Sequence, residues 1–184
     1  MHKLSRPING HWIPHSHSAT YCLAPMEGQP GERLLAGVPG GDPAPFAHLV
    51  VSLEPPYFLL YVLHTPRGEG DAGRYQSPPL SRAQFEDFMH RFGTYLSSDA
   101  RFDLWAHSAA QRATVVWDRH NQLFAYGPLD GYAAVLDALG FARGDTDMSF
   151  PHQHHYRQEF DSEALALLAY LPWSHTTLRP EDEQ

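Results

Sequence analysis

Three apolar runs joined by short polar links constrain the fold of this chain more than any other feature. The links read SAAQR and RHN, and the runs occupy residues 102–107, 113–118 and 122–127. In the middle run, Val115 and Trp117 share one face and alternate with the intervening residues, as in a strand. Asn121 can adopt the left-handed backbone conformation that a tight hairpin turn needs. The pattern predicts a three-stranded antiparallel meander.

Four further runs are candidate strands. YFLLYVLH at 57–64 is apolar on both faces, which is typical of a central strand. A β-rich run at 48–53 precedes it, and Glu54-Pro55-Pro56 forces a turn or an abrupt bend between the two. TYCLAP (20–25) and RLLAGV (33–38) are shorter candidates nearer the N-terminus.

The clearest helix signal lies in LSRAQFEDFMHRFGTYLSSD. Ser81 is a favourable N-cap, and Gln84 three residues later completes a capping box. The apolar residues that follow recur with helical spacing, at Phe85, Phe88, Met89, Phe92 and Leu96. We therefore expect a helix over residues 82–97 that lays one face on a sheet.

A second helix is expected in LDGYAAVLDALGF, over residues 129–141. Asp130 is the predicted N-cap, and Gly140 is the predicted C′ residue beyond the last turn. Phe141 would then close over Leu136, the contact that accompanies a Schellman cap.

A third helix is expected in DSEALALLAYLPW. Asp161 is its predicted cap, Phe160 is expected to staple onto Leu165, and Pro172 ends it. Because this helix is apolar almost all round, it should be deeply buried or should meet a partner with one face.

The predicted order is β-β-α-β-β-β-α-α, which favours an α+β fold. We expect an antiparallel sheet of about five to seven strands with helices packed mainly on one face. Residues 1–46 are rich in Pro, Gly and His, and are expected to be an arm packed on the body or covering it. Within the arm, 37–46 is expected to be irregular because proline fixes φ and removes donors. The α+β domain would span 47–177, and 178–184 would be a disordered acidic tail.

Charge and cysteine content exclude several classes of function. The formal net charge of −8 disfavours nucleic acid and anionic membranes as partners, and Lys3 is the single lysine. Cys22 is the single cysteine, so no intrachain disulfide can form. The N-terminus lacks the apolar core of a secretory signal, and no run reaches the length of a membrane span. The expected compartment is the cytoplasm.

Histidine is abundant, with 13 residues, and two H-x-H pairs suggest a metal site. In an extended segment, residues i and i+2 point to the same side, so both imidazoles of a pair can bind one ion. The predicted ligands are His15, His17, His152 and His154, with zinc or nickel as the metal, and with Asp145, Asp147 or a further histidine able to complete the site. Against a dedicated site, no H-E-x-x-H or C-x-x-C spacing occurs, and both pairs lie in loop-like sequence.

Other catalytic constellations are not supported. Asp118 and His120 could orient and deprotonate Ser108, but the meander puts the turn after Ser108 and the turn after Asp118 at opposite ends of the sheet. No base or helix N-terminus adjoins Cys22, which reads as a small buried hydrophobe. We therefore assign no catalytic residue.

The aromatic content exceeds what a small core needs, which suggests an interaction surface. Its candidate residues are Trp105, Trp117, Leu167, Tyr170 and Trp173. We expect a soluble, non-enzymatic binding or regulatory protein that acts through an apolar and aromatic surface on a protein partner or as a homodimer. The alternative is a metal-dependent enzyme or metal sensor built from the histidine pairs.

Overall fold

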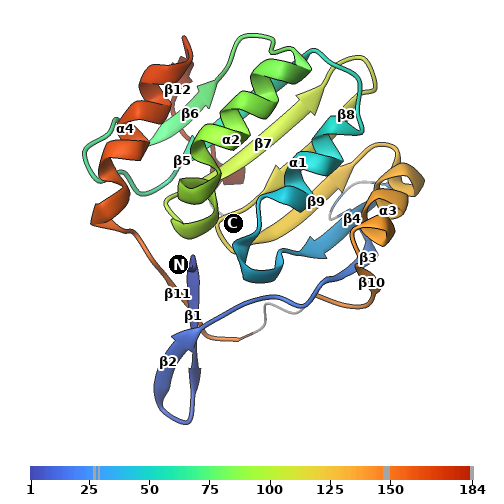
Figure 1. Ribbon diagram of the computed structural model, residues 1–184, viewed down its shortest axis with the longest axis horizontal. Helices are drawn as coiled ribbons and strands as arrows, with labels where there is room; N and C mark the ends of the chain where they lie inside the picture. The colour runs from blue at the N-terminus through green and yellow to red at the C-terminus, as the bar shows by residue number, and fades with distance from the viewer. Residues whose placement is uncertain (27, 29, 147–149, 183–184) are drawn as a thin grey trace.

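The computed structural model describes residues 1–26, 28, 30–146 and 150–182 and has an α+β architecture (Figure 1). The four α-helices of this part of the chain are α1 (Ala44–Val51), α2 (Arg82–Ser98), α3 (Leu129–Ala138) and α4 (Asp161–Tyr170). The strands of the large sheet are β3 (Thr20–Pro25), β4 (Glu32–Gly37), β5 (Tyr57–Leu63), β6 (Gly73–Gln76), β7 (Phe102–Ser108), β8 (Ala113–Trp117), β9 (Gln122–Tyr126), β10 (Ala142–Arg143) and β12 (Ser174–Thr176). A small sheet contains β1 (Leu4–Ile8), β2 (His11–Pro14) and β11 (Gln153–His154).

The large sheet confirms the predicted α+β class and is larger than expected. Its order is β10-β3-β4-β9-β8-β7-β5-β6-β12, and the pairs are antiparallel except for β10 with β3. At its centre, β7, β8 and β9 form the predicted meander. Among the described residues, β3 and β4 continue the sheet beyond β9 as candidate strands of the sequence, and the unpredicted β6, β10 and β12 raise the number above the expected five to seven. The Pro/Gly-rich arm therefore enters the main sheet itself.

The predicted strand at 48–53 is wrong, because this segment belongs to α1. Phe46, Leu49, Val50 and Leu53 are all buried and follow helical spacing. Packing of this stripe on the sheet outweighs the strand preference of the β-branched residues. The helix also begins inside 37–46, since proline is tolerated in a first turn, where its missing N–H has no helical partner.

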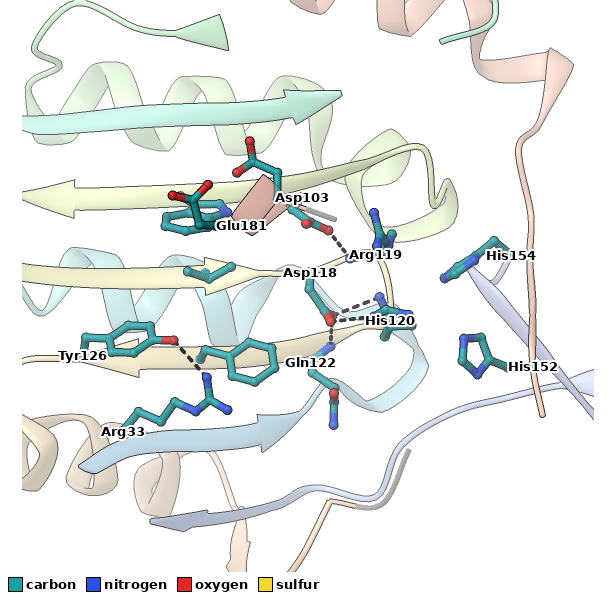
Figure 2. Close-up of a pocket in the computed structure, with 14 residues that line it drawn as sticks. Arg33, Asp103, Asp118, Arg119, His120, Gln122, Tyr126, His152, His154 and Glu181 are labelled. Atoms are coloured by element: carbon teal, nitrogen blue, oxygen red, sulfur yellow. Dashed lines mark hydrogen bonds and ion pairs between the residues drawn. The ribbon is translucent and has the colours of Figure 1, made fainter. Parts of the chain in front are cut away.

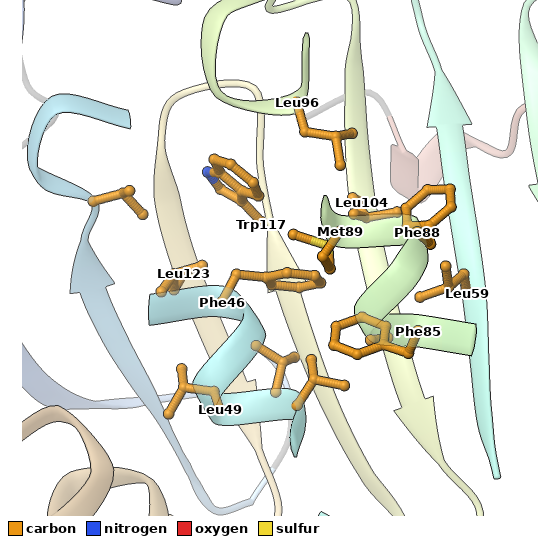
Figure 3. Packing of buried hydrophobic residues seen from close by; sticks show 14 of the residues in the cluster. Phe46, Leu49, Leu59, Phe85, Phe88, Met89, Leu96, Leu104, Trp117 and Leu123 are labelled. Atoms are coloured by element: carbon orange, nitrogen blue, oxygen red, sulfur yellow. The ribbon is translucent and has the colours of Figure 1, made fainter. Parts of the chain in front are cut away.

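Helix α2 confirms the strongest local prediction. The Ser81 hydroxyl accepts from the Gln84 backbone N–H at 3.3 Å, and the Gln84 side chain accepts from the Ser81 N–H at 2.9 Å. Its apolar stripe meets α1 and the sheet, where Phe46 packs between Phe85 and Trp117 (Figure 3).

Helix α3 ends as predicted but begins earlier. Gly140 has φ of 83°, and the Phe141 N–H bonds the Leu136 carbonyl at 3.0 Å, as in a Schellman cap. Asp130 is not the N-cap: the first helical bond runs from Tyr132 N–H to the Pro128 carbonyl, which places Asp130 in the first turn.

Helix α4 also begins one residue before its predicted start, with Phe160 in the cap position. Asp161 does not cap the helix, since its carboxylate pairs with Arg67 and Arg101. The predicted staple of Phe160 onto Leu165 is wrong: Leu165 is 52% exposed, whereas Phe160 is buried against Tyr95.

The two ends of the described chain are held by different contacts. The hairpin of β1 and β2 pairs with β11 and projects below the large sheet in Figure 1. At the other end, a 3₁₀ turn at Pro180–Asp182 holds Asp182 buried in an ion pair with Arg74, so the expected disorder of the tail does not extend to these residues. The last two residues of the predicted tail lie outside the described residues.

The helices cover one face of the large sheet, and alternate residues of its strands point to the opposite face (Figure 1). In β7, Leu104 and Ala106 are buried in the core, whereas Asp103 and Trp105 alternate with them and point to the opposite face. Within the described ranges, no helix combines the length and apolar character needed to cross a bilayer.

Candidate metal centre and ligand pocket

A cavity of about 590 Å³ lies on the sheet face away from the helices (Figure 2). Its floor consists of residues that alternate with core residues along four neighbouring strands: Arg33, Trp105, Val116 and Phe124. Glu181 and Asp182 of the C-terminal turn line one side. A volume of this size suits a small organic ligand.

Three histidines converge at one end of the cavity. His120, His152 and His154 each offer a ligand atom, and these atoms all lie within 4.8 Å of one another. His120 comes from the tight turn between β8 and β9, where Asn121 has φ of 58°. The other two come from the segment around β11, which β1 holds in place by the pairing of Leu4 with His154.

Hydrogen bonds orient two of the imidazoles for metal binding. His120 Nδ1 lies 2.8 Å from Asp118 Oδ2, and His152 Nδ1 lies 3.1 Å from the Phe150 carbonyl. Because these oxygens accept hydrogen bonds, Nδ1 carries the proton in the neutral form of each ring, and Nε2 of that form has a free lone pair. A carboxylate–histidine pair of this kind is the usual support for a metal-bound imidazole.

His154 is the most perturbed of the three. Its Nε2 is buried and has no hydrogen-bond partner in the described part of the chain. Burial, helped by the neighbouring His120 and His152, lowers the pKa of His154 to about 3. The imidazole is therefore neutral at neutral pH, which is the form that binds a metal.

The neighbouring carboxylates are already engaged. Asp103 accepts from His64 Nε2 at 2.9 Å and from the Arg119 backbone N–H at 2.8 Å. Burial opposes its ionisation, but His64 and Arg119 hold the pKa of Asp103 below its ordinary value. Asp118 also accepts from the backbone N–H groups of His120 and Gln122. The inner ligand set is thus three imidazoles, with the cavity on their open side.

No family model, curated protein or solved structure matches this chain. What the site can do must therefore be argued from its own geometry.

Of the four predicted metal ligands, the structure brings His152 and His154 together with His120. His15 and His17 lie ring to ring at 4.6 Å but line a separate cavity of about 300 Å³. His17 supports the centre indirectly, since its Nε2 bonds the His120 carbonyl at 2.9 Å.

The acids proposed to complete that site do not join the histidine cluster. Asp145 lines the smaller cavity beside His15, and Asp147 lies outside the described residues. Both ring nitrogens of His15 are buried without a partner in the described ranges.

His120 was not named among the predicted ligands, although the sequence left open that a further histidine completes the site. Its sequence signal was the Asp118-x-His120 spacing in a tight turn, which lets the carboxylate reach the ring of the second residue. In the sequence, the same spacing suggests part of a Ser-His-Asp triad with Ser108. The structure places Ser108 at the far end of β7, where its hydroxyl donates to the Glu54 carbonyl at 2.6 Å. Burial raises the pKa of the Cys22 thiol, so this residue is no ready nucleophile.

The five aromatic and apolar interaction candidates have different environments. Trp117 and Leu167 are fully buried and belong to the core, so they offer no surface. Tyr170 and Trp173 pack on Phe88 of α2. Trp105 lines the cavity, where its Nε1–H is buried and lacks a partner among the described residues.

Proposed function

We propose that this protein binds a divalent transition-metal ion of the zinc type through His120, His152 and His154 and acts on a small molecule held beside it. The observation that carries the proposal is the convergence of the three ligand atoms within 4.8 Å, with Nδ1 of two rings tied to acceptors. Leaving three imidazoles and a buried, unpartnered Nε2 together is otherwise unfavourable.

The chemistry of the donors selects the metal. Imidazole suits zinc, nickel, copper and iron, whereas magnesium and calcium prefer oxygen ligands. Zinc accepts three histidines at distances of about 2.1 Å. Three such nitrogens around one tetrahedral ion lie about 3.4 Å apart, which small side-chain movements can reach from the present spacing.

The number of ligands favours reactivity over a purely structural role. Structural zinc sites have four protein ligands, whereas catalytic sites have three and leave one position for water or substrate. The open side here faces the cavity, with Trp105 and Phe124 on its floor. An ion in this position would supply a Lewis acid, or a water molecule with a lowered pKa, next to the bound molecule.

The aromatic floor favours a second candidate function, binding without chemistry. Trp105, Val116 and Phe124 form an apolar surface of the kind that the composition predicts for a binding or regulatory protein. In this second function, the protein would bind the metal and the ligand without converting the ligand, as a metal sensor does. A protein partner and a homodimer remain predictions.

Metal titration tests the proposal. Protein without a tag, stripped with chelator, should bind one zinc ion per chain by calorimetry, and cobalt should give the visible spectrum of a low-coordinate nitrogen site. His154→Ala should weaken zinc binding at least 100-fold, because one of three ligands is lost. His90→Ala, on the exposed side of α2, is the matched control and should bind as the wild type does.

Two results would overturn this assignment. The first is the absence of stoichiometric zinc binding by the folded wild-type protein. The second is equal zinc affinity in the wild type and His154→Ala, especially if a His15→Ala/His17→Ala variant loses affinity instead. Turnover of a small-molecule substrate by the zinc-loaded wild type and not by His154→Ala would separate an enzyme from a sensor.

A further inference from the structure

We infer that the small molecule carries a carboxylate, which Arg33 binds at the end of the cavity away from the histidines. Arg33 lies on β4 and lines the same cavity as the metal centre (Figure 2). The inference deepens the proposed function and rests on it only for the orientation of the ligand.

One edge of the Arg33 guanidinium has no hydrogen-bond partner among the described residues. Nη1 donates to the Tyr126 hydroxyl at 3.2 Å, and the guanidinium carbon lies 4.8 Å from the centre of the Phe124 ring. Nε is buried without a partner, and Nη2 bonds none of the described residues. Nε–H and one Nη2–H point the same way from that edge, and this pair of donors matches the two oxygens of a carboxylate.

No ion pair within the described ranges neutralises Arg33, although the cavity contains several acids. Asp103 is paired with His64, and Asp182 with Arg74. Glu181 is exposed on the other wall. A buried donor without an acceptor is costly, so the unpartnered edge of the guanidinium favours a ligand that supplies an acceptor. At the end of the cavity away from the histidines, the Arg33 guanidinium next to acidic walls suits a monoanion better than a phosphate, which carries more negative charge.

The sheet register sets the size of the ligand. Leu34 pairs with Ala125, so Arg33 lies opposite Tyr126, four residues along β9 from Gln122 beside the histidine turn. At roughly 3.4 Å per residue, the carboxylate subsite lies about 14 Å from that turn.

Between the two ends, the floor is apolar. Trp105, Val116 and Phe124 would pack on a flat apolar body, and the unpartnered Trp105 Nε1–H can donate one hydrogen bond to it. The ligand class is therefore an aryl or alkyl carboxylate whose far end reaches the metal centre.

The test compares an acid with its neutral amide. Calorimetry measures the binding of 2-naphthylacetic acid, 2-naphthylacetamide and 2-naphthyl phosphate to the wild type, both stripped of metal and loaded with zinc. The wild type should prefer the acid to the amide by about 10-fold or more, the worth of a charge-assisted pair of hydrogen bonds. Arg33→Gln should abolish this preference, and Arg33→Lys should lose most of it, because an ammonium lacks the planar pair of donors.

Controls separate this inference from the proposed function. Arg91→Gln, on the exposed face of α2, should leave the preference unchanged. His154→Ala should lose zinc but keep the preference of the metal-free protein for the acid. If His154→Ala loses the preference and Arg33→Gln keeps it, the carboxylate binds the metal and the inference is overturned while the metal site stands. Equal affinity for acid and amide, or a preference for the phosphate, also overturns it.

Discussion

Lys3 gives a prediction whose magnitude follows from the structure. The single lysine of the chain is fully buried below the histidine turn, and its Nζ donates to the Asp118 carbonyl at 3.2 Å. The ammonium lies over the rings of Trp117 and Phe102, at 4.4 and 4.9 Å from their centres. The charged group is thus buried against aromatic side chains.

Burial lowers the pKa of Lys3 to about 8, although nearby carboxylates, chiefly Asp118, oppose the shift. In the unfolded chain the pKa of a lysine is about 10.4, and one pKa unit corresponds to about 1.4 kcal/mol. Below pH 8, Lys3 is charged in both states, so the whole cost of burying the ammonium, about 3 kcal/mol, reduces stability. Between pH 8 and 10.4, the unfolded state binds more protons, so this cost falls as the pH rises.

The expected signal is a gain of about 2 kcal/mol in the free energy of unfolding between pH 7 and 9.5. Urea denaturation at constant ionic strength, with chelator present, should show this gain in the wild type relative to Lys3→Met. The comparison stops at pH 9.5 because burial raises the pKa of Tyr61 and Tyr95. At higher pH these tyrosines ionise more readily in the unfolded chain, so the free energy of unfolding then falls as the pH rises.

Arg91→Met, which removes an exposed cation from α2, is the control and should track the wild type across the pH range. A difference between the wild type and Lys3→Met that stays constant from pH 7 to 9.5 would refute the reasoning, because the lysine would then titrate alike in both states.

Three shorter predictions concern the site and its frame. Asp118→Asn should weaken zinc binding about 10- to 100-fold by calorimetry, because an amide nitrogen in place of Oδ2 cannot accept from His120 Nδ1. Arg101→Gln should lower the free energy of unfolding by about 3–5 kcal/mol in urea titrations, because it leaves buried carboxylates without their cation. Gly37→Ala should cost about 1–3 kcal/mol in the same assay, because the new Cβ would lie 2.5 Å from His17 Cβ; unchanged stability would contradict that packing.

Local signals predicted the parts of the fold that local forces determine. The capping box at Ser81 and the stripe behind it lie within one helix, so α2 could be predicted nearly to the residue. α1 was missed although Phe46, Leu49 and Val50 have helical spacing. Its apolar run is short and β-branched, and only the sheet below it decides between helix and strand.

The site was predicted only in part, because local sequence patterns reveal only those ligands that are close together in the chain. His152 and His154 are two residues apart, so their convergence follows from extended backbone geometry. His120 is more than thirty residues away, and its approach depends on a tertiary arrangement that no periodicity encodes. Arg33 and Trp105 are likewise far apart in the sequence and belong to different strands. Only the order of the strands in the sheet brings both to the floor of the cavity.

The histidine centre lies where the two sheets meet, and this position links metal binding to folding. His120 belongs to the large sheet, whereas His152 and His154 are held by the small sheet through the pairing of β11 with β1. Lys3 lies just before β1 of the small sheet, and its side chain reaches the carbonyl of Asp118, which directly follows β8 of the large sheet. An ion bound to all three histidines would join the same two sheets that Lys3 joins. No further part of the chain would have to become ordered for this. The binding free energy of the ion would therefore add directly to the stability of the contact between the sheets. Through its bond to the Asp118 carbonyl, the buried ammonium holds the turn that carries His120, so this turn is fixed without an ion.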